Sequence, residues 1–375
     1  MIKPTLFLSI FITFLSGFFH VTKGQETLSQ KLGKANSLIY SNPEKAIQLG
    51  NEVYEKSNDQ KLKLSALIML GTAYSEKSDV DKSIEVLLKA ETLAESEKDY
   101  VNEVRALSLL GYQYQILQIT QKTHAYLDQA EEVIRKHGLP DSLMYLRGNN
   151  YSIKALTYQQ TLDCGYAIDY FNKAISVYKR LKDNDVSKIN LNIAYLNKAS
   201  CFLENKNTDS AKVALAEGDR ILKSLDATDD LLISQDIAWA KYYYETKDYH
   251  QSLKILNANL EKAKEMSQFW VNNEIYHLLS QNYLALNDIE KYNHFSNLYV
   301  ETQKKVSEAE KNSISHIINQ PLENKAQESV SRSKIVYLIS GILGVILVLI
   351  ILFSVKSFRL KRKIKDMKLG QNQES

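Results

Sequence analysis

Residues 109 to 114 read LLGYQY and residues 167 to 178 read AIDYFNKAISVY, and these two stretches show the unit from which the chain is built. In the first, the small residue Gly111 is followed three positions later by the aromatic residue Tyr114. In the second, apolar residues recur at helical spacing, at Ala167, Phe171 and Ala174. Spacings of three and four positions place side chains on one face of a helix. The two stretches therefore predict amphipathic helices that pack in pairs.

The combination of a small residue and an aromatic one recurs through the chain at intervals of 40, 44, 44, 41 and 40 residues. The small residue would let the second helix of each pair approach closely, while the ring fills the space beside it. Since no pair can bury its apolar face alone, neighbouring pairs are expected to stack. The recurring combinations are Gly71/Tyr74, Gly111/Tyr114, Ala155/Tyr158, Ala199/Phe202, Ala240/Tyr243 and Ser280/Tyr283.

LLGYQY and AIDYFNKAISVY resemble tetratricopeptide repeats, and the resemblance covers about 280 residues. The standard unit has about 34 residues, so these longer units are similar to the variants found in bacterial sensor and regulator proteins. The resemblance implies an all-α fold, a right-handed superhelical solenoid of about seven antiparallel helix pairs over residues 25–310. An unrelated helical array of the HEAT or armadillo kind is the alternative, because its period is similar.

The ends of the chain predict a membrane topology. Residues 335–355 form an apolar run without a charge, long enough as one helix to cross a hydrocarbon core of about 30 Å. Residues 1–24 combine a basic start, an apolar region and small residues, which predicts a signal peptide, with an uncleaved anchor as the alternative. Seven basic side chains in residues 356–375 favour a cytoplasmic tail. We expect a single-pass protein of a bacterial inner membrane, its repeat domain periplasmic and residues 311–334 a stalk.

The order of these segments resembles the sensory half of bacterial membrane regulators of the helix-turn-helix or histidine-kinase type. The sequence continues for only 20 residues beyond the predicted crossing, so we expect no output domain. Ser340 and Gly344 make a small-xxx-small pair, which favours a homodimer through the membrane helix.

Composition and motifs argue against catalysis and against nucleic-acid binding. Between the two ends, 38 basic residues face 42 acidic ones, and a net charge near −4 does not attract phosphates. Phosphate loops, nucleophile elbows and metal-ligand spacings are missing from the sequence, so no cofactor or metal is expected. The stretch from Ser315 and His316 to Leu322 resembles a phosphoacceptor box, which leaves a degenerate sensor kinase as an alternative. Cys164 and Cys201 could form a disulfide or pack as two thiols.

The first helices of the pairs are expected to form the inner, concave face of the solenoid. Positions about one turn either side of each small residue would line it. Such a polar and aromatic face suits a protein or peptide ligand, so the leading prediction is a noncatalytic binding protein that relays a signal. A structural scaffold for an envelope complex is the alternative. The candidate lining residues are Arg105, Tyr112, Gln115, Asn149, Gln159, Lys241, Tyr244, Glu274, His277 and Gln281.

Overall fold

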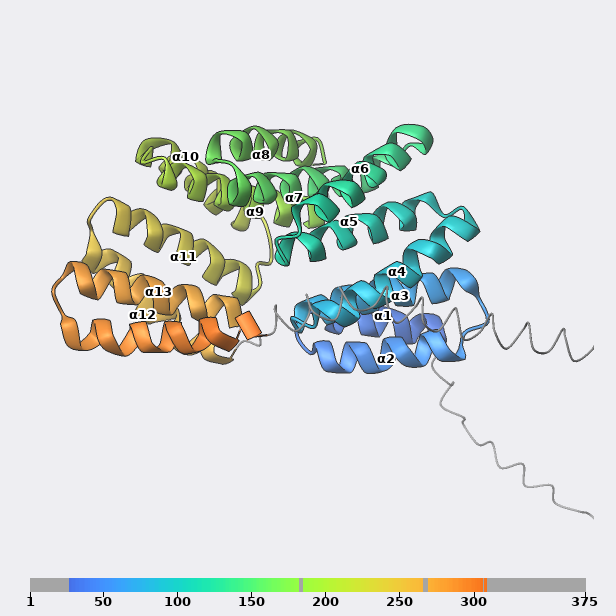
Figure 1. Ribbon diagram of the computed structural model, residues 1–375, viewed down its shortest axis with the longest axis horizontal. Helices are drawn as coiled ribbons and strands as arrows, with labels where there is room; N and C mark the ends of the chain where they lie inside the picture. Colours follow the sequence, from blue (N-terminus) through green and yellow to red (C-terminus); the bar gives the residue numbers. More distant parts are fainter. Residues whose placement is uncertain (1–26, 182–184, 266–268, 306, 309–375) are drawn as a thin grey trace, which may run out of the picture. The chain divides into compact units, whose positions relative to one another are not determined.

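The computed structural model describes residues 27–181, 185–265, 269–305 and 307–308, and these residues are helical apart from short connections (Figure 1). No strand occurs among them. The packing divides the chain into two compact units. Of the described residues, the first unit holds those up to 115, 119–201 and 217–225, and the second holds 116–118, 202–216 and those from 226 onward.

The helices follow one another as antiparallel pairs joined by tight turns. In the first unit, α1 packs on α2, α3 on α4 and α7 on α8, and in the second α11 packs on both α12 and α13. The helices are α1 (Leu28–Leu38), α2 (Pro43–Lys56), α3 (Gln60–Glu76), α4 (Val80–Glu97), α5 (Tyr100–Ile116), α6 (Thr120–His137), η1 (Asp141–Leu143), α7 (Tyr145–Thr161), α8 (Cys164–Lys179), α9 (Asp185–Glu204), α10 (Thr208–Leu222), α11 (Asp229–Glu245), α12 (Tyr249–Glu265) and α13 (Phe269–Ala285). Residues 289–305 are also helical.

At Gly71 and Gly111, the small residue of the repeat lies against a leucine of the second helix. A methyl group added to Gly71 would lie 2.5 Å from a methyl carbon of Leu87, and one added to Gly111 would lie 2.7 Å from Leu127. Both leucines are fully buried. The close approach also allows a hydrogen bond, since the Ser83 hydroxyl donates to the Gly71 carbonyl at 2.8 Å. The predicted role of the small residue is therefore confirmed by the packing.

The turns within the pairs repeat as faithfully as the helices. In five of the six repeats, the backbone takes a left-handed conformation seven positions after the small residue, with φ between 57° and 65°. The next residue is usually Asp or Asn, and its side chain accepts from the backbone N–H three positions later, as Asp79 does from Lys82 at 3.3 Å. This bond satisfies one of the free amides that begin a helix. The left-handed residues are Ser78, Gln118, Lys206, Lys247 and Asn287.

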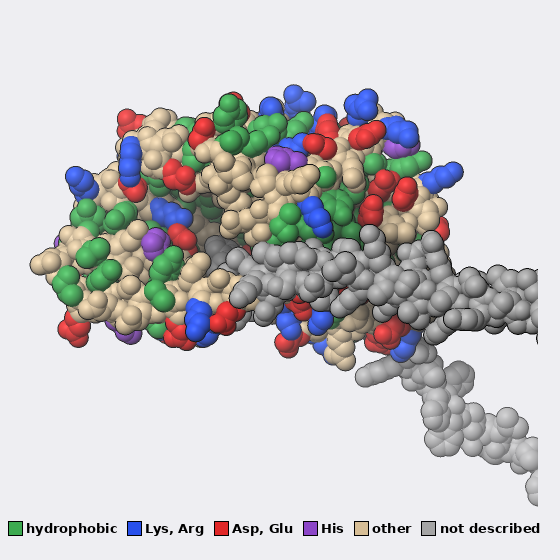
Figure 2. Space-filling model, viewed as in Figure 1, with side chains coloured by type: hydrophobic (Ala, Val, Ile, Leu, Met, Phe, Trp, Pro, Cys, Tyr) green, Lys and Arg blue, Asp and Glu red, His purple; other side chains and the backbone are tan. Residues whose placement is uncertain are grey.

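The described helices are too polar to cross a membrane, and this contradicts the predicted location in a bacterial inner membrane. Among the described residues, none of the helices combines the length and the apolar character that a bilayer crossing demands. The 18-residue α4, for example, carries the exposed ion pair Glu85–Lys89 at 2.6 Å. Figure 2 shows charged side chains spread over the surface of the described helices. The predicted signal peptide, stalk, membrane helix and basic tail lie outside the described residues.

The two cysteines are buried and are not bonded to each other. Cys164 opens α8 and Cys201 lies within α9. Of the two states that the sequence left open, the structure has the packed thiols.

The close contact at Gly71 can be tested with two alanine substitutions. Gly33 is also helical, but a methyl group there meets nothing within 4 Å. Both substitutions gain up to about 1 kcal/mol of helix propensity, whereas only Gly71→Ala crowds a buried leucine, at a cost of about 1–3 kcal/mol. We expect Gly71→Ala to be less stable than Gly33→Ala by about 1–3 kcal/mol in urea denaturation. Equal stabilities would show that the helix pair can separate without penalty.

Candidate functional site

Each first helix leaves one stripe of side chains partly exposed. The stripe contains the residue six positions before the small residue and the residue one position after it, and none of these is buried. The two positions are seven residues, or about 10 Å, apart along the helix. We call the stripe the first-helix face. Its earlier row is Ser65, Arg105, Asn149, Ile193, Ser234 and Glu274, and its later row is Thr72, Tyr112, Leu156, Ser200, Lys241 and Gln281.

Contacts between successive first helices join their stripes in the first unit. Gln113 of α5 donates through Nε2 to the Ser75 hydroxyl of α3 at 2.8 Å. Val104 of α5 and Leu146 of α7 belong to one buried apolar cluster. Asn190 of α9 donates through Nδ2 to Oδ1 of Asn149 in α7 at 2.9 Å. The first-helix face of this unit is therefore continuous over α3, α5, α7 and α9.

Asn149 is the most thoroughly held of the candidate residues. Its Oδ1 accepts from Asn190 and also from the Tyr178 hydroxyl of α8 at 2.8 Å. Gly148 makes room for this tyrosine, since a methyl group there would lie 2.4 Å from the ring. Burial raises the pKa of Tyr178 well above its usual range, so its hydroxyl stays a neutral donor. Both bonds use Oδ1, so the Nδ2 group of Asn149 takes no part in them.

Tyr112 is the aromatic residue of the face. Its side chain is 38% exposed, yet protein atoms surround its hydroxyl closely enough to desolvate it. This burial, with the nearby Glu76 and Tyr40, raises the pKa of Tyr112 to about 12. A neutral phenol beside an exposed ring can contact apolar groups and donate a hydrogen bond at the same place.

In the second unit, the structure brings two of the candidate residues together. Lys241 of α11 and Glu274 of α13 form an ion pair at 2.7 Å, with about one third of each side chain exposed. They lie in the later row of one first helix and the earlier row of the next. The first-helix face of this unit is therefore charged, whereas that of the first unit is mainly uncharged.

The other candidates are more scattered. Gln115 is buried, so it does not line the face. The ring centroids of His277 and Tyr299 lie 4.7 Å apart, and those of Tyr244 and Tyr249 lie 5.7 Å apart. Arg105 donates a hydrogen bond to Oδ1 of Asn102 at 3.2 Å. Gln159 and Gln281 are half-buried.

The sequence reasoning missed Tyr178 and Asn190, which position Asn149. Tyr178 follows the apolar spacing of a second helix, so its sequence signal is that of a core residue. Asn190 lies nine positions before Ala199, whereas the candidates were predicted within about one helical turn of each small residue. No local pattern indicates that either side chain reaches Asn149.

The side chains of the face suit binding better than chemistry. Amide, hydroxyl and aromatic groups dominate, and they can hydrogen-bond and pack but do not transfer protons readily near neutral pH. Among the residues that the structure describes, no three or more His, Cys, Asp or Glu side chains converge as metal ligands.

Comparison with solved structures identifies the fold of this chain. No family model matches the chain, and no curated protein matches it. Solved structures do match. NprR in complex with its cognate peptide NprX is 17% identical, covering 77% of this chain and 82% of that chain with a TM-score of 0.56.

Two further structures agree with this placement. The Rap conjugation gene regulator of the plasmid pLS20, in complex with the Phr* peptide, is 15% identical over 75% of this chain and 74% of that chain, with a TM-score of 0.60. A signal transduction ATPase from Pyrococcus horikoshii with a tetratricopeptide repeat sensor is 15% identical over 74% of this chain and 41% of that chain, with a TM-score of 0.52. The fold is therefore an all-α solenoid of tetratricopeptide-like repeats.

Tyr178→Phe tests the support of Asn149. Losing the hydroxyl removes its hydrogen bonds to Asn149 and Ser152, so the free energy of unfolding at pH 8 should fall by about 1–3 kcal/mol. The pKa of Tyr178 is raised in the folded state, so the stability it contributes is present below about pH 10 and is lost as the pH rises further. In urea denaturation, the free energy of unfolding should fall less between pH 8 and pH 11 for the variant than for the wild type.

Tyr166→Phe is the control for this substitution, because the Tyr166 side chain is 57% exposed. Its alkaline profile should match that of the wild type. A wild-type stability that does not change between pH 8 and pH 11 would contradict the role given to the buried hydroxyl.

Proposed function

We propose that this chain is a noncatalytic binding protein that holds an extended peptide on the first-helix face of its first unit. The peptide would be a free peptide or a segment of a protein partner. This proposal rests above all on the composition of the two rows.

In the first unit, the rows hold one charged residue, Arg105, among eight positions, although a quarter of the residues in the whole chain are charged. The remaining seven positions hold hydroxyl, amide, aliphatic and aromatic side chains. Protein interfaces are depleted of charge at their centres and enriched in tyrosine. An ordinary solvated face would carry more lysine and glutamate, as the second helices do.

The spacing of the first helices suits an extended chain. Packed helices lie about 8–10 Å apart, and an extended peptide advances about 3.3 Å per residue, so roughly three residues pass each helix. Four first helices would then accommodate a segment of about ten residues. The backbone N–H and C=O groups of such a segment need partners. Asn149, Ser65 and Thr72 supply donors and acceptors for them.

The solved structures add support of a different kind. NprR was solved with the peptide NprX, and the pLS20 regulator with the Phr* peptide. Both have the fold of this chain at TM-scores above 0.5. Peptide binding is therefore a use to which proteins of this architecture are put.

A random dodecapeptide display library tests the proposal. Peptides selected on the full chain would be labelled and titrated by fluorescence anisotropy against the double variant Tyr112→Ala/Ile193→Ala. Both side chains are exposed, at 38% and 40%, so the variant should fold normally. We expect its affinity to fall at least about tenfold, the effect of losing about 1.4 kcal/mol at an interface.

The matched control is Val213→Ala/Leu232→Ala, which also shortens two exposed apolar side chains but away from the rows. It should bind the selected peptides as the wild type does. Failure to select any peptide, or equal losses in the two double variants, would refute binding at the first-helix face.

A further inference from the structure

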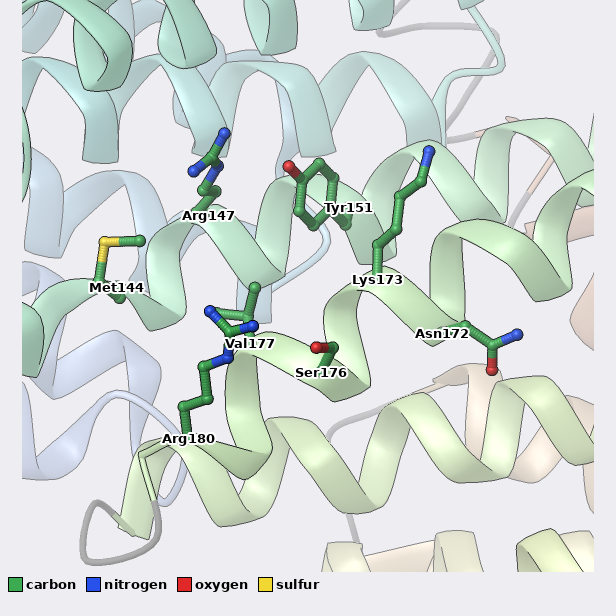
Figure 3. Close-up of a pocket in the computed structure, with 8 residues that line it drawn as sticks. All are labelled: Met144, Arg147, Tyr151, Asn172, Lys173, Ser176, Val177 and Arg180. Carbon is green, nitrogen blue, oxygen red and sulfur yellow. The ribbon is translucent and has the colours of Figure 1, made fainter.

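The outer side of the fourth helix pair carries a groove that the proposed function does not use. Figure 3 shows its eight lining residues, which come from α7 and α8 and its flanks. Its volume is about 450 Å³. On α7, its residues Arg147 and Tyr151 lie about half a helical turn away from Asn149 and Leu156 of the first-helix face. The groove and the first-helix face are thus two separate surfaces.

The same groove occurs in the second helix pair, between α3 and α4, with a volume of about 460 Å³. Each of the eight lining residues in Figure 3 has its counterpart 84 positions earlier in this second groove. Arg147 corresponds to Lys63, and Lys173 to Lys89. The groove is therefore a feature of the repeat, and its two copies can be compared position by position.

The comparison shows that the fourth pair has gained polar and cationic groups. Its groove has Tyr151 and Asn172 where the second pair has leucines, and Arg180 where the second pair has Ser96. None of its eight lining residues is acidic.

Two of the three cations in the groove remain available to a ligand. Arg147 is ion-paired with Glu131 of α6. The Lys173 ammonium lies 4.0 Å from the centroid of the Tyr170 ring, a contact that leaves its charge uncompensated. Arg180 is exposed and forms no ion pair with the residues that the structure describes. An acidic segment that lies along the groove would therefore meet two positive charges.

An aromatic ridge continues the groove along α8. The Tyr158 and Tyr170 rings lie 5.0 Å apart, and Tyr158 is 6.2 Å from Tyr166. In three other pairs, the residue eight positions after the repeat tyrosine is a lysine lying over its ring, as Lys82 is over Tyr74. In the fourth pair this residue is Tyr166, which is 57% exposed. At this position the ridge therefore differs from the repeat pattern, because tyrosine, a residue common at protein interfaces, replaces lysine.

We propose that the groove and ridge of the fourth helix pair bind an acidic, aromatic-containing segment of a partner protein. A carboxylate of the partner lies between Lys173 and Arg180, and its apolar or aromatic side chains lie on Tyr158 and Tyr166. From Tyr166 to Arg180, α8 offers about 20 Å of surface. The exposed carboxylate of Asp169, one turn before Lys173 on α8, would repel a continuous run of phosphates, which favours a protein over a nucleic acid.

A fluorescein-labelled random copolymer of glutamate and tyrosine is the probe, titrated by anisotropy against the full chain. We expect Lys173→Ala/Arg180→Ala to weaken binding at least tenfold. The matched control is Lys63→Ala/Lys89→Ala, which removes the same charge from the equivalent groove of the second pair and should stay within twofold of the wild type. Tyr112→Ala/Ile193→Ala should also bind the copolymer normally, which separates this surface from the first-helix face.

Three results would overturn the proposal. The wild type could fail to bind the copolymer up to 1 mM (about the weakest specific affinity), or the two lysine-containing double variants could lose affinity equally. The third is tighter binding of a labelled dodecamer of thymidylate, which would mark the ridge as a site for single-stranded nucleic acid. Circular dichroism melting curves of all variants should coincide, because each substituted side chain lies at the surface.

Discussion

The close approach of two helices at one small residue is the contact on which the rest of this structure depends. Gly71 and Gly111 let buried leucines come within a distance that any side chain would obstruct. Where the repeat has alanine instead, as at Ala240, the Ser252 hydroxyl still reaches the backbone carbonyl, at 2.9 Å. The contact fixes the separation of the two helices, and the left-handed turn residue and its Asp or Asn cap then fix their direction. The exposed positions of the helices are free to vary, since the pair is already determined by its buried residues.

This freedom explains how one repeat can present different surfaces. The first-helix face lies opposite the outer groove on α7, and neither contributes to the contact at the small residue. In the first unit the rows of the first-helix face are almost uncharged, whereas in the second unit Lys241 and Glu274 pair across them. Substitution at a row position changes the surface without changing the core. A solenoid therefore separates the residues that fold it from the residues that bind.

The same separation of folding residues from surface residues decides how much of this structure the sequence predicts. The spacing of the glycine, alanine and aromatic residues indicates the helix pairs, because packing between the two helices determines that spacing. The burial of Ser83, Leu87 and Ala90 agrees with this prediction. The stripe of the first helices is also predictable, since it follows from helical periodicity. The support of Asn149 by Tyr178 and Asn190 is not, because it joins three helices through side-chain lengths and directions that no local spacing encodes. The membrane location was inferred from residues that the structure does not describe, and the described helices contradict it.

The fourth helix pair shows what a departure from the repeat means physically. Its turn has Leu162 at φ −127° where the other turns have a left-handed residue, and this leucine is 61% exposed. Its lysine over the repeat tyrosine is replaced by Tyr166, and Asn172 and Arg180 replace apolar or small residues in its groove. Tyr166 contacts Tyr158 but remains 57% exposed, and large exposed apolar side chains such as Leu162 and Tyr166 are unfavourable in water. The core of this pair is closed, with Phe171 and Ala174 fully buried and Tyr178 filling the space that Gly148 leaves, whereas these departures lie at the surface. The proposed partner would cover these exposed side chains, which the packing of the pair does not require.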